Sequence, residues 1–347
     1  MSKLAVESST VQSPLVNHAV AAGWEFVSET DALARRKGED GLFFYDELES
    51  ALLRLNPGVV TPENVASVIT SMEAVPPTME GNRQLLEWVR GRKTVFVPSE
   101  KRSLNVMVVD FNHPLEPGRN KFEVTVEWAF RKHWKKGNRP DVVFLVNGVP
   151  VALVECKNPK LKNAMEKALV QLRRYELETP EMMVAPQVFN ITHLIEYFYG
   201  VTWTYERKGV FNWKHQLTAM KSGSYTEVPP PTSALHAENP VEDLPLAAET
   251  PPPSYGEQVK SFFDRQRFLL LLNEWILFFA KDDELKKTVL REHQTRAATK
   301  VVDRCLDPGK TRGLVWHTQG SGKTFTMITA ARLLLEGKLP TMEGAME

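Results

Sequence analysis

Three polar residues with complementary chemistry, Asp141, Glu155 and Lys157, lie at the ends of apolar segments near the middle of the chain. Two apolar runs of strand length fall within residues 142–154, and the Asn-Gly pair between them is typical of a β-hairpin turn. Burying a carboxylate and an ammonium group at the ends of such strands costs several kcal/mol unless a partner neutralises them. A divalent metal held by Asp141 and Glu155, with Lys157 near a bound phosphate, would do so. These residues therefore predict a metal-dependent phosphodiesterase.

The register of the hairpin decides whether the two carboxylates can share a metal. Successive strand residues point to opposite faces, so Glu155 and Lys157 share a face. A strict two-residue turn at residues 147–148 would pair Asp141 with Val154 and would turn Glu155 to the other face. A three-residue loop or a single bulge would instead pair Asp141 with Glu155 on one face. The sequence therefore predicts an odd-length loop or a single bulge, and a solvated salt bridge at a strand end is the alternative.

A helix is predicted over residues 160–177, which carry apolar side chains at helical spacing. Gln171 and Tyr175 are four residues apart and so lie on one face of this helix. Gln171 falls within the apolar stripe, so its amide needs a partner such as the active-site backbone or a DNA phosphate. A boundary position, half in water, is the alternative. Cys156 lies between two residues that share a face and is expected to point away from them into the core.

The charge of the chain is balanced overall but unevenly placed. The chain has 347 residues, enough for about two domains, with 43 Lys plus Arg and 43 Asp plus Glu. A net charge of zero excludes the overall positive charge that is typical of many nucleic-acid-binding proteins. Residues 131–174, however, hold eleven basic and three acidic residues, a local excess of eight. Such a patch would draw a polyanion to the predicted metal site, and a solvated basic face is the alternative.

Cysteine usage and hydropathy indicate the compartment. Cys156 and Cys305 are the only cysteines and have no metal-ligand spacing, which favours a reducing environment. Residues 1–20 lack the apolar core of a secretory signal, and the most apolar run, residues 268–279, is too short to cross a bilayer. A cytoplasmic protein with no membrane partner is therefore expected.

Strands followed by a helix and further strands predict an α/β fold. The N-terminal helices are expected over residues 46–55, 62–74 and 83–91, and the strands over residues 24–27, 104–111, 121–130, 184–191 and 199–205. Residues 221–254 contain two Pro-Pro-Pro runs and are expected to form a linker or a surface excursion. After it come expected helices over residues 256–281 and 283–304, a short strand over 313–316 and a helix over 325–336.

The short strand, glycine-containing loop and helix near the C-terminal end predict a P-loop, although His317 stands where the general pattern has glycine. Lys323 would reach the β- and γ-phosphates of a nucleotide, and Thr324 would ligate magnesium. Gln294, some thirty residues upstream, could contact an adenine edge, and an exposed helical glutamine is the alternative. Phosphates would be cradled at the helix N-terminus by the backbone N–H groups of Gly320, Ser321 and Gly322.

These motifs carry a family resemblance when they are taken together. Residues 140–141, 155–157 and 171–175 resemble the PD-(D/E)xK nuclease signature in its exonuclease-like variant. Four further motifs occur in the same order along the chain as in one family. They are Leu-Asn-Pro at residues 55–57, Phe-x-Trp-Lys at residues 211–214, His-Gln at residues 293–294 and the P-loop. This combination, which spans nearly the whole chain, resembles the restriction (motor) subunit of type I restriction–modification enzymes.

The resemblance implies an α/β, mixed-sheet, restriction-endonuclease-like nuclease domain followed by the beginning of a P-loop motor domain. The expected division is residues 1–220 for the nuclease, 221–255 for the linker and 256–347 for a partial motor lobe. The implied activity is Mg²⁺-dependent endonucleolytic cleavage of double-stranded DNA, with ATP as the motor's nucleotide and with methyltransferase and specificity subunits as partners. Asp141 and Glu155 would hold Mg²⁺, Lys157 would assist catalysis, and Gln171 and Tyr175 would position the strand.

One departure from the family is length, because the family continues well past the P-loop into further motor elements. The chain is therefore expected to be an engineered fragment or the product of a truncated gene, with weak ATP binding at most and no translocation. Two alternatives from other functional classes remain. One is a catalytically silent DNA-binding or assembly fragment, and the other is a P-loop ATPase with a decayed nuclease domain.

Overall fold

The computed structural model describes residues 11–132, 136–161, 163–194, 196–213, 254–309, 312–315 and 319–336. The segment expected as a linker lies almost entirely outside these residues, as do residues 317–318 at the start of the expected P-loop and residue 316 at the end of the strand expected before it. No helix in the described ranges is long and apolar enough to cross a membrane.

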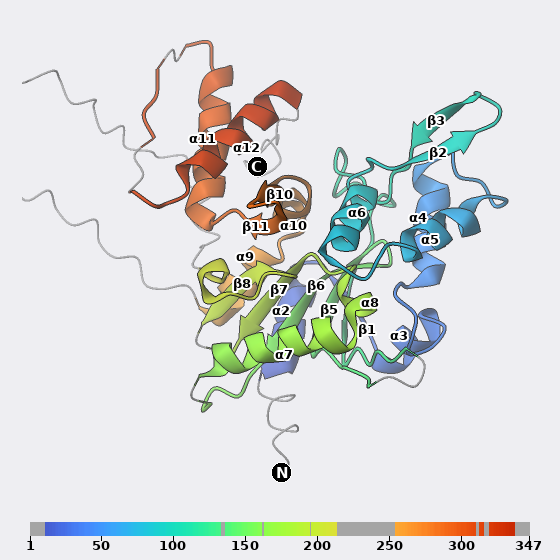
Figure 1. Ribbon diagram of the computed structural model, residues 1–347, viewed down its shortest axis with the longest axis horizontal. Coiled ribbons are helices and arrows are strands. Elements are labelled where there is room, and N and C mark those ends of the chain that lie inside the picture. The colour runs from blue at the N-terminus through green and yellow to red at the C-terminus, as the bar shows by residue number, and fades with distance from the viewer. Residues whose placement is uncertain are drawn as a thin grey trace, which may run out of the picture.

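A mixed sheet of seven strands lies at the centre of the N-terminal part of the fold (Figure 1), which confirms the expected α/β class. Across the sheet the strands are β1 (Glu25–Val27), β4 (Phe122–Val126), β5 (Val142–Val146), β6 (Val149–Cys156), β7 (Val188–Thr192), β8 (Tyr197–Val201) and β9 (Phe211–Asn212). The pairs β1–β4 and β6–β7 are parallel, and the other neighbours are antiparallel. The middle strands β5, β6 and β7 are buried along their whole length, which explains why their sequences read as almost continuous apolar runs.

Helices cover both faces of this sheet. On one face the core includes residues of α2 (Ser13–Ala21) and α9 (Tyr255–Phe262), and on the other it includes residues of α7 (Ala164–Glu178) and α8 (Pro180–Met183). Figure 1 shows α7 lying across the strands on the near side and α2 behind them. The remaining N-terminal helices are α3 (Glu29–Arg35), α4 (Tyr45–Leu55), α5 (Val65–Glu73) and α6 (Met79–Val89).

The strand predicted over residues 104–111 is wrong over most of its length. Only the short hairpin of β2 (Thr94–Val97) and β3 (Arg102–Asn105) reaches into this segment. Beyond it, the side chain of Asn56 replaces a neighbouring strand: its amide donates to the carbonyl of Met107 at 2.8 Å and its carbonyl accepts from the N–H of Met107 at 2.6 Å. Val106, Val108 and Val109 are buried without forming a strand, and the side-chain amides of Asn56 and Asn147 pair with the backbone of Met107 and Val108 in place of a neighbouring strand.

The continuous helices predicted over residues 256–281 and 283–304 are also wrong in part. After α9 come α10 (Arg265–Leu270) and a π-helical turn, Leu271–Trp275, and then an antiparallel hairpin. The hairpin strands β10 (Ile276–Lys281) and β11 (Glu284–Val289) are joined by Asp282 and Asp283, both with positive φ angles (52° and 59°). An apolar run of this length does not distinguish strand from helix by its pattern alone, and the two-residue turn decides the outcome.

Residues 255–289 pack on the nearby sheet as part of its core. Val259, Phe262 and Ile276, for example, belong to the same buried cluster as β5 and β6. Lys287 of β11 is buried in this contact, where its Nζ lies 2.6–3.1 Å from four oxygens that can share its three N–H groups. These oxygens belong to Asn82 of α6, to Gln187 just before β7 and to Thr202 just after β8. The expected division of the chain at residues 220 and 255 stays a prediction, since these contacts describe packing only.

The last part of the described chain holds α11 (Glu292–Leu306) and α12 (Lys323–Glu336), which lie side by side (Figure 1). They share a small core of their own, formed by Ala298, Val302, Ala330 and Leu333. The helix predicted after the P-loop is therefore confirmed. The strand predicted over residues 313–316 is wrong for its described part, residues 313–315, where Leu314 and Val315 are exposed and no described strand lies beside them to pair.

Candidate active site

The turn between β5 and β6 has two residues, Asn147 and Gly148, with positive φ angles of 49° and 78°. Val146 pairs with Val149 across this turn, so the three-residue form of the predicted loop is wrong. The pairing then shifts by one residue after Phe144, which confirms the predicted alternative of a single bulge. An Asn-Gly pair favours this turn because both positions need positive φ angles.

The bulge brings Asp141 and Glu155 back to the same face of the hairpin, which the two-residue turn alone would not allow. Extended by one step, the register beyond the bulge places Asp141 opposite Glu155. Val143 and Leu153, two residues from each of them along the strands, pack in the core beneath α7. Because side chains repeat every second residue, Asp141 and Glu155 both point to the α7 face. Pro150 lies at the shift, and its lack of an N–H group explains why the ladder is interrupted there.

Lys157 links the two carboxylates. Its Nζ lies 2.9 Å from Oε2 of Glu155 and 3.9 Å from Oδ2 of Asp141. Glu155 is fully buried and Lys157 is 7% exposed. Asp141 is held in addition by the backbone N–H of Cys156, which donates to its Oδ2 at 2.7 Å. The Cys156 side chain lies in the core on the opposite face of the sheet, as predicted.

Two residues of α7 close the other side of this cluster. Oε1 of Gln171 accepts from Nζ of Lys157 at 3.0 Å, and Nε2 of Gln171 donates to the hydroxyl of Tyr175. The Tyr175 hydroxyl donates in turn to the backbone carbonyl of Arg139 at 3.1 Å. Gln171 is half-buried, which fits the alternative of a boundary position. Its amide does have partners within the site, but they are the side chains of Lys157 and Tyr175 rather than the backbone that was predicted. The chain of contacts fixes Lys157 relative to the strand that carries Asp141.

Burial dominates the protonation of the cluster. It raises the pKa of Asp141 to about 8, and the negative charge of Glu155 adds to this rise. Burial also raises the pKa of Glu155, although the neighbouring Lys157 opposes that rise. Burial disfavours the charged form of Lys157, but the two carboxylates outweigh it and raise its pKa. Two carboxylates share one ammonium group, so ionising both leaves an excess of negative charge. Without a cation Asp141 instead holds a proton at neutral pH, and a bound divalent cation would favour its ionised form.

A hard divalent cation fits these donors. Oε1 of Glu155 is buried and makes no hydrogen bond of good geometry within the described part of the chain, although the Tyr175 hydroxyl lies close enough to lower the pKa of Glu155. A buried acceptor without a partner costs roughly 1–3 kcal/mol, so its presence favours a ligand absent from the polypeptide. Across the described ranges no group of three or more His, Cys, Asp or Glu side chains gathers to hold a metal. Two carboxylates suit Mg²⁺, which keeps several waters and takes the substrate phosphate as a further ligand.

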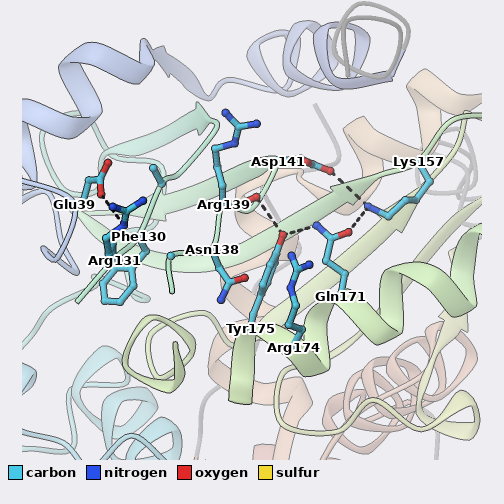
Figure 2. Close-up of a pocket in the computed structure, with 12 residues that line it drawn as sticks. Glu39, Phe130, Arg131, Asn138, Arg139, Asp141, Lys157, Gln171, Arg174 and Tyr175 are labelled. Atoms are coloured by element: carbon cyan, nitrogen blue, oxygen red, sulfur yellow. Dashed lines mark hydrogen bonds and ion pairs between the residues drawn. The ribbon is translucent and has the colours of Figure 1, made fainter. Parts of the chain in front are cut away.

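A polar pocket of about 460 Å³ opens beside the cluster (Figure 2). Figure 2 shows Lys157 directed toward both Asp141 and Gln171, with Tyr175 between Gln171 and Arg139. Basic side chains contribute much of its wall, in keeping with the basic segment seen in the sequence. The charged residues that line the pocket are Glu39, Arg131, Arg139, Asp141, Lys157 and Arg174.

Three residues around Asp141 had no signal in the sequence that marked them. Nε of Arg139 lies 2.8 Å from Oε2 of Glu127, and Oε1 of Glu127 accepts from Nε2 of Gln12 at 3.0 Å. The same Gln12 amide donates to the backbone carbonyl of Asp141 at 2.6 Å. Gln12 comes from a segment more than a hundred residues away, so only the folded chain brings it here. Arg139 is one of the eleven basic residues in the segment 131–174, but the sequence pattern gave it no specific role.

The P-loop residues begin α12, and α11 supplies their nearest polar contacts. Gly320 and Gly322 have positive φ angles of 76° and 81°, while Lys323 and Thr324 open the helix. Nε2 of Gln294 donates to the carbonyl of Gly322 at 2.9 Å, so the glutamine is buried against the loop rather than exposed. The hydroxyl of Ser321 is buried and has no hydrogen-bond partner among the described residues. The structure thus brings Gln294 and the loop together, 28 residues apart in sequence.

Comparison with known proteins gives two matches along the chain. Residues 5–206 match the family described as the type I restriction enzyme R protein N terminus, and residues 293–343 match the SWI2/SNF2 ATPase family. The first match contains the carboxylate–lysine cluster and most of the sheet, and the second contains the P-loop. The two matches together identify the N-terminal portion of a type I restriction enzyme R protein followed by the start of a SWI2/SNF2 ATPase region.

Individual relatives carry the same description. The chain is 26% identical over 343 residues to the type I restriction enzyme HindI endonuclease subunit of Haemophilus influenzae, covering 92% of this chain and 29% of that protein. It is 24% identical over 302 residues to a putative type I restriction enzyme endonuclease subunit, MjaIXP, of Methanocaldococcus jannaschii, covering 83% and 27% respectively. The chain belongs to the family of type I restriction enzyme R (endonuclease) subunits. It spans less than a third of the length of these relatives.

Proposed function

We propose that this chain cleaves double-stranded DNA in a Mg²⁺-dependent reaction, through a restriction-endonuclease-like site built on β5, β6 and α7. The observation that carries the proposal is the pair of opposed carboxylates, Asp141 and Glu155, bridged by the buried amine of Lys157. A solvated salt bridge at a strand end would not need to be buried, and Glu155 is fully buried. Burial of this excess negative charge is reasonable if a cation and a phosphate complete the site.

Each residue of the cluster has a role that follows from its contacts. Mg²⁺ held by Asp141 and Glu155 would supply Lewis-acid stabilisation of the phosphate and would lower the pKa of an attacking water. Lys157, which reaches both carboxylates, would orient that water or neutralise negative charge developing on the phosphate. Gln171 and Tyr175 hold Lys157 and the Arg139 carbonyl at a fixed spacing, which keeps the groups within reacting distance.

We further propose that the C-terminal part of the chain contributes to a nucleotide site. Gly320, Ser321 and Gly322 would cradle phosphates, Lys323 and Thr324 would contact the phosphates and magnesium, and Gln294 would contact the adenine of ATP. The buried Ser321 hydroxyl and the positive φ angles of both glycines support a loop shaped for an anion. Hydrolysis and DNA translocation would require the longer subunit of the family. Methyltransferase and specificity subunits are proposed as the partners that select the DNA site.

The test uses the longer R subunit that carries this segment, assembled with its partner subunits on DNA. Lys157→Ala and Asp141→Ala are each expected to abolish Mg²⁺-dependent cleavage while thermal unfolding shows a folded domain. ATP hydrolysis by the same complex provides the control, because it depends on a separate site. Retained cleavage in both variants would remove the nuclease assignment and would favour a DNA-binding or assembly role instead.

A further inference from the structure

Arg139 lies on the wall of the pocket, two residues before the metal-site carboxylate of Asp141. Its backbone is fixed to α7 because its carbonyl accepts from the Tyr175 hydroxyl at 3.1 Å. Its side chain is 48% exposed, and its Nε lies 2.8 Å from Oε2 of Glu127. Glu127 is thus the ion-pair partner of Arg139 within the described chain, and the pairing occupies one edge of the guanidinium. The other edge remains available to a ligand in the pocket.

The backbone of Glu127 suggests that this ion pair is more than a surface contact. Glu127 directly follows β4 and has a φ angle of 52°, a left-handed conformation that a non-glycine residue adopts at a cost of about 1–3 kcal/mol. An exposed ion pair returns at most about 1 kcal/mol, so stability alone does not account for this arrangement. Strained backbone that neighbours over-determine is commonly found at functional sites.

The surroundings of Glu127 hold it in this position. Its backbone N–H donates to the carbonyl of Asp141 at 2.9 Å, and its Oε1 accepts from Nε2 of Gln12 at 3.0 Å. The Gln12 amide also donates to the same Asp141 carbonyl at 2.6 Å. The carboxylate that orients Arg139 is therefore tied to the strand that carries the proposed metal ligand. A shift of one would move the other.

We propose that Arg139, oriented by Glu127, binds a DNA backbone phosphate next to the phosphate that is cleaved. This inference rests on the proposed nuclease function and adds a substrate contact to it. A guanidinium fixed along one edge presents its remaining N–H groups as a fork, which matches the oxygens of a phosphodiester. Arg131 and Arg174 also line the pocket and add positive charge, so an anionic strand rather than a neutral ligand is favoured.

The experiment measures binding of the full chain to a short DNA duplex without divalent cations, so that no cleavage occurs. Binding is measured at several salt concentrations between about 50 and 200 mM. Arg139→Gln is expected to weaken binding about tenfold at the lowest salt and to reduce the slope of log K against log salt by about 0.9, the value for one phosphate contact. Arg139→Lys is expected to keep the slope and lose part of the affinity, because it keeps the charge without the fork.

Arg83→Gln is the matched control. Arg83 is 46% exposed and forms an ion pair with Glu80 on α6 at 2.8 Å, so it resembles Arg139 in exposure and in having a carboxylate partner without lining the pocket. It is expected to leave both affinity and slope unchanged, and both variants should unfold at the same temperature. An unchanged slope in Arg139→Gln, or an equal loss in Arg83→Gln, would overturn the phosphate contact.

The positioning role of Glu127 is tested by a double-mutant cycle. If Glu127 acts through Arg139, Glu127→Gln changes the DNA affinity of the otherwise unmodified chain but not that of Arg139→Gln. Additive effects would overturn this role. The two proposals fail in different assays. If the nuclease assignment is wrong, Asp141→Ala will still cleave DNA in the assembled enzyme. If only the phosphate contact is wrong, the salt dependence of DNA binding, which is measured without cleavage, will not change in Arg139→Gln.

Discussion

In the metal-free protein the raised pKa of Asp141, about 8, opposes folding at alkaline pH. The carboxylate is largely buried beside Glu155, and its ordinary value is 3.8. The folded state therefore holds a proton between about pH 4 and pH 8 that the unfolded state has released, so stability falls as pH rises through this window. Asp141→Asn removes this titration and keeps the shape of the side chain, including an acceptor for the Cys156 N–H.

The size of the effect follows from the shift. A rise from 3.8 to about 8 corresponds to roughly 6 kcal/mol if the environment acted in full. The Asp141 side chain is 26% exposed and Lys157 lies 3.9 Å away, so water and the ammonium group reduce this figure. We expect Asp141→Asn to be more stable than the unmodified chain by about 3 kcal/mol near pH 9, with the difference shrinking toward zero near pH 4.

The assay is urea unfolding at about pH 5, pH 7 and pH 9 without divalent cations, followed by tryptophan fluorescence. Trp24 and Trp213 are buried in the core beside the sheet and report on its loss. Mg²⁺ should stabilise the unmodified chain, by about 2.7 kcal/mol at a hundred times its Kd, and should leave Asp141→Asn unaffected. Asp40→Asn, at an exposed aspartate, is the control. Equal stability of the unmodified chain at pH 5 and pH 9, or a destabilised Asp141→Asn at every pH, would refute this reasoning.

Further predictions concern three other positions. Tyr175→Phe, which loses the hydroxyl contacts to Gln171 and to the neighbouring strand, is expected to lower stability by about 1–2 kcal/mol and to slow cleavage about tenfold; unchanged cleavage would exclude the positioning role. Lys287→Met should lower the free energy of unfolding by about 2 kcal/mol, since it leaves buried acceptors unpaired, and a more stable variant would contradict this. Gly322→Ala should weaken ATP binding by the longer subunit at least tenfold, because a φ of 81° is strained for any residue with a Cβ and the new Cβ would displace the Gln294 amide from the Gly322 carbonyl; binding within a factor of two by calorimetry would argue against it.

The candidate site was largely predictable because its geometry follows from strand periodicity. Two apolar strands, an Asn-Gly turn and the need for Asp141 and Glu155 to share a face left few registers, and a bulge was one of them. The helix carrying Gln171 and Tyr175 was predictable for the same reason, since its apolar spacing is regular.

Other features depended on contacts that a local pattern does not contain. Asn56 took the place of a strand partner for the segment around Met107, and a side chain 51 residues away cannot be read from an apolar run. The hairpin at residues 276–289 depends on Asp282 and Asp283, which form its turn with positive φ angles. The positions of Glu127 and Gln12 depend on a left-handed backbone and on a contact across 115 residues. Tertiary structure, rather than local propensity, decided each of these.

Anomalous diffraction from crystals of this chain soaked with Mn²⁺ in place of Mg²⁺ would locate a cation bound by Asp141 and Glu155. We expect one strong peak within about 2.2 Å of a carboxylate oxygen of both residues, with Oε1 of Glu155 among its ligands, and loss of that peak in Asp141→Asn. A site that stays without a peak at saturating Mn²⁺, or a peak that persists in Asp141→Asn, would contradict this expectation.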